Sequence, residues 1–158
     1  MADPLIHPHE TLTTPAGEDV EIDLDMVPVV RELWRLRIKT TACCQDVGEA
    51  TAGVRAQRDT PLGYGGDGFI AYHRGWALLK LPVPDARRLV ALLAETPDFA
   101  PHVCHPWRPG SWRMNVPLGQ DGIADDALLH LPREQLPSLA EALRAVDGLT
   151  RSSPGTAP

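Results

Sequence analysis

The hydrophobic residues that follow Asp25 recur at the spacing of an amphipathic helix. Four of them share one helical face: Met26, Val29, Val30 and Leu33. Asp25 is a suitable N-cap, and Pro28 falls in the first turn, where its missing N–H costs little. The pattern therefore predicts a helix over residues 26–36.

After this helix the pattern is that of short strands and loops. Residues 38–43 are rich in β-branched side chains, which predicts a strand. Residues 45–66 contain many glycines and are typical of a loop, although residues 47–58 can instead form a short helix that starts near Asp46. Because a loop of this length is uncommon unless it is functional or mobile, the segment is a candidate for function.

Two later segments share the order strand, strand and helix. The pattern predicts these elements over residues 68–72, 76–81 and 84–95 in the first segment, and over residues 111–118, 127–131 and 133–146 in the second. The first pair of strands is predicted to turn at His73, Arg74 and Gly75. Such units suit an α+β fold, mainly an antiparallel sheet with helices packed on one face.

The two segments also align at an offset of fifty positions. Residues 77–82 match residues 127–132, Leu89 matches Leu139, and Leu93 matches Leu143. An internal repeat of a strand–strand–helix unit explains this match. A chance alignment of segments rich in alanine and leucine, or a common strand–proline–helix junction, would produce it too.

Length and composition place the chain among ordinary globular proteins. Its 158 residues fit one domain, which we expect over residues 21–150, after an extended N-terminal arm (1–20) and before a disordered tail (151–158). The net charge of −6 disfavours broad binding to nucleic acid. Since there is neither a visible signal peptide nor an apolar run of about 20 residues, we expect a soluble cytoplasmic protein with reduced cysteines.

The end of the predicted strand carries the first group of chemically active residues. Strand alternation sends Cys43 and Cys44 to opposite faces, so we expect Cys43 in the core and Cys44 beside Gln45 and Asp46 at a cleft. Cys44 can be a structural thiol, or a nucleophile if a cation or helix N-terminus favours its thiolate. The candidate bases for such a catalytic site are His73, His102 and His105.

A second group of candidate residues lies in the loop around residue 104. His102, Cys104 and His105 can supply part of a zinc site, completed by Cys43 or Cys44, but the same loop can be a rigid surface segment without metal. His7 and His9 in the N-terminal arm are weaker candidates. The stretch from Trp107 to Arg113 alternates aromatic and basic residues, which can bind nucleic acid or simply lead into a strand.

A run of short motifs between Val20 and Tyr72 carries a resemblance to other proteins: Ile22-Asp23, Met26-Val27-Pro28, Leu33-Trp34, Ile38-Lys39-Thr40-Thr41, Cys44-Gln45 and Gly68-Phe69-Ile70. It resembles small uncharacterised actinobacterial and bacteriophage proteins, which implies a shared fold and no established activity. Cys43 stands where their pattern more often has serine. Residues 40–44 are also similar in part to a segment of wybutosine-synthesis tRNA methyltransferases, from which no catalytic residue is carried over.

These patterns favour a non-catalytic accessory protein that binds a small molecule or a protein partner. The expected cleft lies between the Cys44 loop, His73 and residues 102–112. The expected ligand-binding residues are Gln45, Asp46, His105 and Trp107. The alternatives are an enzyme with Cys44 as nucleophile and His73 as base, and a structural zinc protein. A distance of about 3.5–4 Å from Cys44 to a histidine or to Cys104 would favour chemistry or metal binding.

Overall fold

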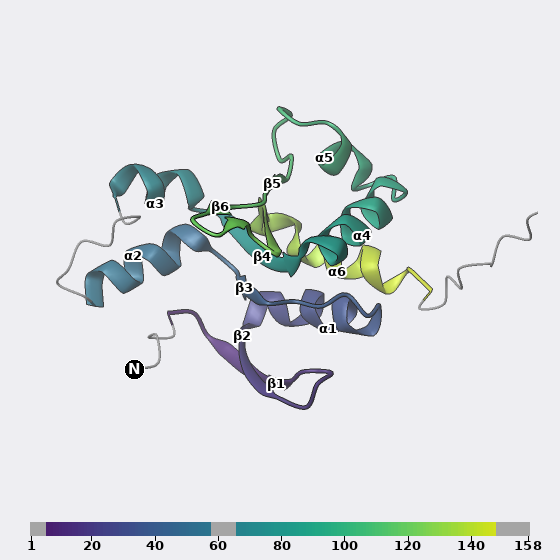
Figure 1. The fold of residues 1–158 in the computed structure, drawn as a ribbon, viewed down its shortest axis with the longest axis horizontal. Helices are drawn as coiled ribbons and strands as arrows, with labels where there is room; N and C mark the ends of the chain where they lie inside the picture. The colour runs from purple at the N-terminus through teal and green to yellow at the C-terminus, as the bar shows by residue number, and fades with distance from the viewer. Residues whose placement is uncertain (1–5, 58–65, 148–158) are drawn as a thin grey trace, which may run out of the picture.

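The computed structural model describes residues 6–57 and 66–147, and Figure 1 shows their arrangement. The elements are β1 (His9–Thr13), β2 (Asp19–Asp23), the 3-10 helix η1 (Leu24–Met26), α1 (Val27–Arg35), β3 (Ala42–Cys44), α2 (Val47–Gln57), α3 (Asp67–His73), β4 (Trp76–Pro82), α4 (Val83–Ala94), α5 (Ala100–Cys104), β5 (Arg113–Asn115), β6 (Leu118–Gly119), β7 (Gly122–Ile123), β8 (Asp126–Pro132), the 3-10 helix η2 (Arg133–Gln135) and α6 (Leu136–Arg144). The predicted tail, residues 151–158, lies outside the described residues. Within them, no helix has the length and apolar character needed to cross a bilayer.

The centre of the fold is a four-stranded antiparallel sheet in the order β3-β4-β8-β5. β4 and β8 pair along their full length, with Leu79 opposite Leu129 at the middle. Two hairpins, β1-β2 and β6-β7, form separate two-stranded sheets. The predicted α+β class with a mainly antiparallel sheet is therefore confirmed.

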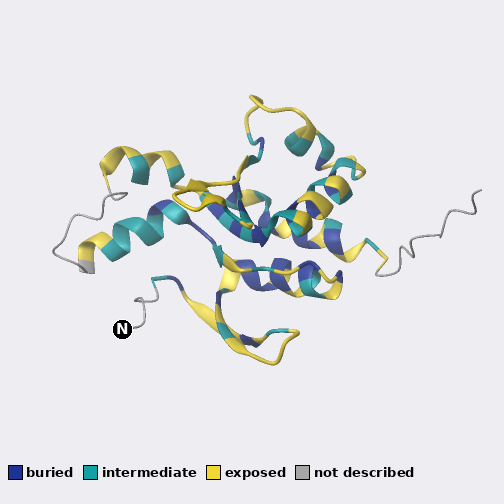
Figure 2. Ribbon diagram, viewed as in Figure 1, coloured by how far each residue is buried: buried dark blue, intermediate teal, exposed yellow. Residues whose placement is uncertain are grey.

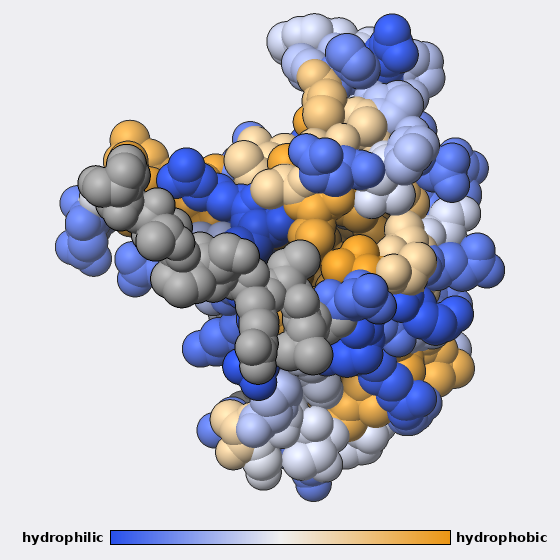
Figure 3. All heavy atoms as spheres, turned by 90° about the vertical axis from the view of Figure 1, so that its right-hand side faces the viewer, coloured by the Kyte–Doolittle hydropathy of each residue, from blue (hydrophilic) through white to orange (hydrophobic). Residues whose placement is uncertain are grey.

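One face of the central sheet forms the hydrophobic core. Alternate residues of both long strands are buried, as expected for strands with one face in the core: Ala77, Leu79, Leu81, Ala127, Leu129 and Leu131. They join one cluster with buried leucines of three helices, among them Leu33 in α1, Leu89 in α4 and Leu143 in α6. Figure 2 shows the buried residues on the sides of these elements that face one another. Figure 3 shows one face of the molecule, on which hydrophobic residues form a patch near the middle among mainly hydrophilic ones.

The two halves of the sheet repeat the same arrangement of two paired strands and a helix, although the first half builds it from other residues than predicted. β3 pairs with β4 in the register that β5 uses with β8, since Cys43 lies opposite Leu79 and Met114 lies opposite Leu129. The helices that precede the two edge strands also correspond. α1 precedes β3 and contacts α6, whereas α5 precedes β5 and contacts α4. Both strand–helix junctions close with equivalent hydrogen bonds, from Val83 N to Asp125 O (2.9 Å) and from Arg133 N to Gly75 O (2.8 Å).

The prediction of a strand over residues 68–72 is wrong, because this segment is the helix α3. The partner strand of β4 in the first half is instead β3. Phe69 and Ile70 are adjacent and both half-buried, which a strand with one buried face does not allow. The rings of Phe69 and His73 lie 4.1 Å apart at helical spacing. A short apolar run does not distinguish a helix from a strand. The helices α2 and α3 can meet closely because Gly48 in α2 lies against the backbone of Arg74, the residue after α3.

Two other boundaries differ from the sequence pattern. Asp25 lies inside η1 and does not cap α1, whose first turn contains Pro28 as predicted. The strand predicted over residues 38–43 begins only at Ala42 in the structure. Ile38, at its predicted start, belongs instead to the Schellman motif that ends α1. In this motif Ile38 N donates to Leu33 O (2.9 Å), and Arg37 adopts a positive φ of 58°.

We expect Arg37→Gly to stabilise the protein. Arg37 is exposed and holds a left-handed conformation, which costs a side-chain-bearing residue roughly 1–2 kcal/mol and glycine little. Glycine also raises the entropy of the unfolded chain, which offsets part of this gain. Urea unfolding should therefore show a free energy of unfolding that is higher by about 0.5–1 kcal/mol. Arg87→Gly, at an exposed position inside α4, is the control and should lose about 1 kcal/mol. A loss of stability in Arg37→Gly would contradict the assignment of backbone strain.

Candidate functional site

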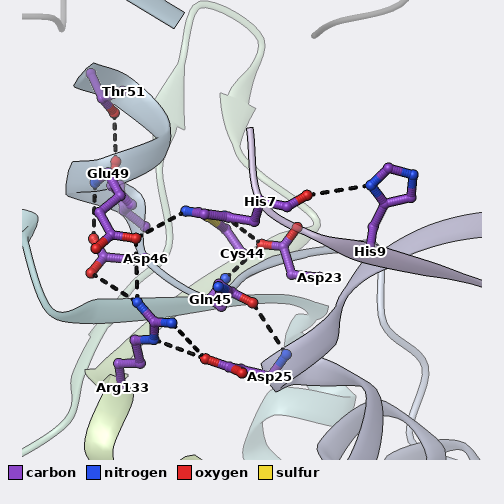
Figure 4. Close-up of polar contacts among 11 residues, drawn as sticks. His7, His9, Asp23, Asp25, Cys44, Gln45, Asp46, Glu49, Thr51 and Arg133 are labelled. Atoms are coloured by element: carbon purple, nitrogen blue, oxygen red, sulfur yellow. Dashed lines mark hydrogen bonds and ion pairs between the residues drawn. The ribbon is translucent and has the colours of Figure 1, made fainter. Parts of the chain in front are cut away.

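A closed ring of polar contacts connects the N-terminal arm, the first hairpin, α2 and η2 (Figure 4). We call it the Arg133 network; its members are His7, Asp23, Asp25, Gln45, Asp46, Glu49 and Arg133. The contacts join segments as far as 108 positions apart in sequence. The network therefore ties the arm to the junction between β8 and α6.

Arg133 is the cation at one end of this network. Its guanidinium donates two hydrogen bonds to Asp25 Oδ2, at 2.7 and 2.9 Å, and lies 3.3 Å from Glu49 Oε2 and 3.9 Å from Asp46 Oδ2. The hydrogen bond to Asp25 raises the pKa of Arg133, with Glu49 and Asp46 adding to it. Arg133 is thus a fixed positive charge among three carboxylates.

Gln45 and Asp46, two of the predicted ligand-binding residues, are almost fully buried and bind the backbone. Asp46 accepts hydrogen bonds from Glu49 N (2.9 Å) and Gly75 N (2.8 Å), so it caps α2 and holds the start of β4. The amide oxygen of Gln45 accepts from Asp25 N at 3.1 Å. Both side chains position the loop, and Asp46 also lines a cavity.

The nearest described histidine contact of Cys44 is with His7, not with the predicted base His73. Cys44 Sγ lies 3.9 Å from His7 Nδ1, within the range that favours chemistry or metal. His7 Nδ1 also lies 2.9 Å from Asp23 Oδ2. Both Cys43 and Cys44 are half-buried, and Cys43 packs against the edge of the hydrophobic core.

Both neighbouring thiols are held in their neutral form. Burial raises the pKa of Cys44 to about 12, and the Asp23 carboxylate adds to the effect. Burial likewise raises the pKa of Cys43 to about 12. In addition, Asp23 and Cys44 approach the same ring nitrogen of His7, whereas a catalytic triad uses one nitrogen for each partner. This geometry does not favour Cys44 as a nucleophile.

A cavity of about 740 Å³ opens beside the Arg133 network. Its lining combines apolar and charged residues from η1, α1, α2, the start of β4, η2 and α6: Leu24, Asp25, Pro28, Asp46, Glu49, Arg74, Gly75, Arg133, Glu134, Leu136 and Pro137. Of the residues predicted to bind a ligand, Asp46 belongs to this lining, and Gln45, His105 and Trp107 do not. The cavity is therefore next to the predicted Cys44 loop but does not extend to the loop 102–112.

His73 belongs to a separate aromatic and cationic cluster. Its ring lies 5.2 Å from that of His130, and the Arg113 guanidinium lies 4.1 Å from the ring of Tyr72 and 3.6 Å from that of Trp76. Burial lowers the pKa of His130 to about 4, with His73 and Arg113 adding to the effect. This cluster holds β5 and α3 against the solvent-side face of β4 and β8.

The segment 102–112, predicted as a loop, begins with the last residues of α5 and is held by η2 and not by the cysteines of β3. Trp112 Nε1 donates to Gln135 Oε1 at 2.8 Å, while His105 and Trp107 are exposed. Among the described residues, the group whose ligand atoms lie close enough for a metal is His7, Asp23 and Cys44. The predicted zinc ligands His102, Cys104 and His105 are not brought together in this way.

No protein-family model, curated protein or solved structure matches this chain. The residues that sequence reasoning missed are Asp25, Glu49 and Arg133, along with the proximity of His7 to Cys44. Their side chains are common on protein surfaces, and only the fold brings them together. The one local feature that singles out Arg133 in the sequence is its position directly after Pro132, the proline that ends β8.

We expect the stability of the protein to fall between about pH 7 and pH 5 in a way that depends on His130. In the unfolded chain His130 binds a proton below its ordinary pKa of 6.5. In the folded chain, where its pKa is about 4, it does so only near pH 4. Acid therefore favours the unfolded state, by roughly 1–2 kcal/mol at pH 5. Urea unfolding at both pH values should show a smaller acid loss in His130→Gln and an unchanged loss in the exposed control His105→Gln. An equal acid loss in all three proteins would refute this.

We expect the three cysteines to differ in reactivity. Cys104 is exposed, whereas burial and a raised pKa protect Cys43 and Cys44. With iodoacetamide and EDTA at about pH 8, peptide mass spectrometry should find Cys44 modified about tenfold or more slowly than Cys104. The same reaction in urea is the control and should remove the difference. Faster modification of Cys44 in the folded protein would restore the nucleophile hypothesis.

Proposed function

We propose that the protein is a binding protein whose cavity beside Asp46 takes a ligand with a cationic group and an apolar body. The observation that carries this proposal is the lining of the cavity. Its volume of about 740 Å³ falls in the range of small-molecule sites. Leu24, Pro28, Leu136 and Pro137 supply apolar surface, and charged groups converge beside it.

The balance of charge favours a cationic ligand. The lining contains four carboxylates and two arginines, a formal balance of −2. Arg133 is already bound by Asp25 and Glu49, so it offers little to an anion. The side chains of Asp25 and Glu49 are nevertheless 46% and 41% exposed, which leaves oxygen atoms accessible to an amine or guanidinium.

Hydrogen bonds and ion pairs within the protein hold several of the residues that line the cavity. Asp46 accepts a hydrogen bond from Gly75 N at the start of β4. Arg133, the first residue of η2, binds Asp25 of η1. A preformed site loses less side-chain entropy on binding, which favours a specific small ligand. This arrangement supports a binding role for the Asp46 loop without a catalytic one.

Hexylamine, hexanoate and hexanol form a matched set of probes for the full-length protein. We expect hexylamine to shift the NMR signals of cavity residues at concentrations where hexanoate and hexanol do not. Glu134→Gln removes a carboxylate from the rim outside the Arg133 network and should weaken hexylamine binding about two- to fivefold, the effect of one exposed ion pair.

Glu141→Gln is the matched control, because Glu141 is an exposed carboxylate in α6 that does not line the cavity. Its affinity for hexylamine should equal that of the unmodified protein. Equal shifts by hexylamine and hexanoate, or shifts confined to residues outside the cavity, would refute the proposal.

A further inference from the structure

The imidazole of His7 is buried between two carboxylates, one at each ring nitrogen. Asp23 Oδ2 lies 2.9 Å from Nδ1, and Glu49 Oε2 lies 3.4 Å from Nε2. The His7 side chain is only 6% exposed, and its Nε2 has no hydrogen-bond partner of good geometry among the described residues. A buried polar atom without a partner is unusual and requires an explanation.

A neutral imidazole cannot satisfy both of these carboxylates. It carries one N–H, so one ring nitrogen must direct a lone pair at a carboxylate oxygen. Either a second proton or a metal cation at the nitrogen that has no proton makes the arrangement favourable, and the position of Cys44 supports the metal. Cys44 Sγ lies 3.9 Å from Nδ1, so a metal ion on that side of the ring would meet a third ligand atom.

We propose that His7 Nδ1, Asp23 and Cys44 Sγ bind a divalent cation of the zinc type. Their ligand atoms all lie within 4.8 Å of one another. Tetrahedral zinc separates nitrogen and oxygen ligands by about 3.4 Å, and nitrogen and sulfur ligands by about 3.6 Å. The distances of 2.9 and 3.9 Å in the structure therefore need adjustments of about 0.5 Å or less.

The donor set favours zinc over hard cations. One imidazole, one thiolate and one carboxylate suit a borderline-soft ion, whereas Mg²⁺ and Ca²⁺ select oxygen ligands. Binding replaces the thiol proton of Cys44, which leaves to solvent. The single imidazole proton then resides on Nε2 and faces Glu49, and water takes the fourth coordination position.

Glu49 has the position of a supporting residue in such a site. Metal-bound histidines commonly donate their second N–H to a carboxylate, which orients the ring. Glu49 lies on the Nε2 side of His7 and also contacts Arg133. The ion would join three segments, the N-terminal arm, β2 and β3, so its expected role is structural.

The test uses the full-length protein, first stripped with EDTA and then titrated with Zn²⁺ by calorimetry and with Co²⁺ by absorbance. We expect one high-affinity site, a thiolate-to-cobalt charge-transfer band, and a rise in Tm of about 5 °C or more at saturating Zn²⁺. Cys44→Ser and His7→Gln should each weaken Zn²⁺ binding by about tenfold or more. Both variants should retain the far-UV spectrum of the unmodified protein, because no core residue is changed.

Two other cysteine variants serve as matched controls. Cys43→Ala removes the neighbouring thiol, and Cys104→Ser removes the exposed one; both should retain the cobalt band and the zinc affinity. If Cys44→Ser does not fold, the band in the Cys43→Ala/Cys104→Ser double variant still tests Cys44 as the sole thiolate. The absence of a band in that protein, or a site lost with Cys104→Ser or His105→Gln, would overturn the proposal. Binding of hexylamine in the cavity is a separate measurement, and its failure would leave the metal result standing.

Discussion

The antiparallel pairing of β4 with β8 is the constraint on which the rest of the structure depends. It builds the core face from alternate residues of both strands, and it places each strand end beside the start of the other. Arg133 N binds Gly75 O as a direct consequence, so the first residue after β8 lies next to the chain that enters β4. Asp46 binds Gly75 from the other side. The strand pairing therefore brings Arg133 close to Asp46 and Glu49 at the start of α2.

The two halves of the fold share a scaffold and differ in what they insert between their strands. The first half places α2 and α3 between β3 and β4, whereas the second places the short β6-β7 hairpin between β5 and β8. At equivalent junctions the chain has Arg133 in one half and Val83 in the other. Only the junction at Arg133 meets an inserted helix, because Asp46 and Glu49 come from the start of α2. The candidate site thus lies where the internal symmetry is broken.

The sequence pattern predicted the elements whose period is strong and missed those that depend on distant partners. β4, β8 and the helices that follow them have alternating or helical hydrophobic spacing, and their offset of fifty positions is visible in the chain. Residues 68–72 have a short apolar run that suits either a helix or a strand, and packing against α2 decides between them. Asp25 resembled a helix cap, but its partner Arg133 is 108 positions away. No local rule connects His7 with Cys44, because the approach of the arm follows from the first hairpin and from the contact of Ile6 with Gly53 in α2.

One electrostatic feature underlies both proposed sites. The Arg133 network contains four carboxylates, of Asp23, Asp25, Asp46 and Glu49, and a single permanent cation, Arg133. Carboxylates this close together repel one another, and partial burial strengthens the repulsion because it removes water. Arg133 offsets the charge at the cavity end, where an additional amine can approach from solvent. At the other end the imidazole of His7 lies between Asp23 and Glu49, and solvent hardly reaches it, while Glu49 also contacts Arg133. The proposed metal ion would supply positive charge there, with Cys44 Sγ as a ligand atom beside His7 and Asp23.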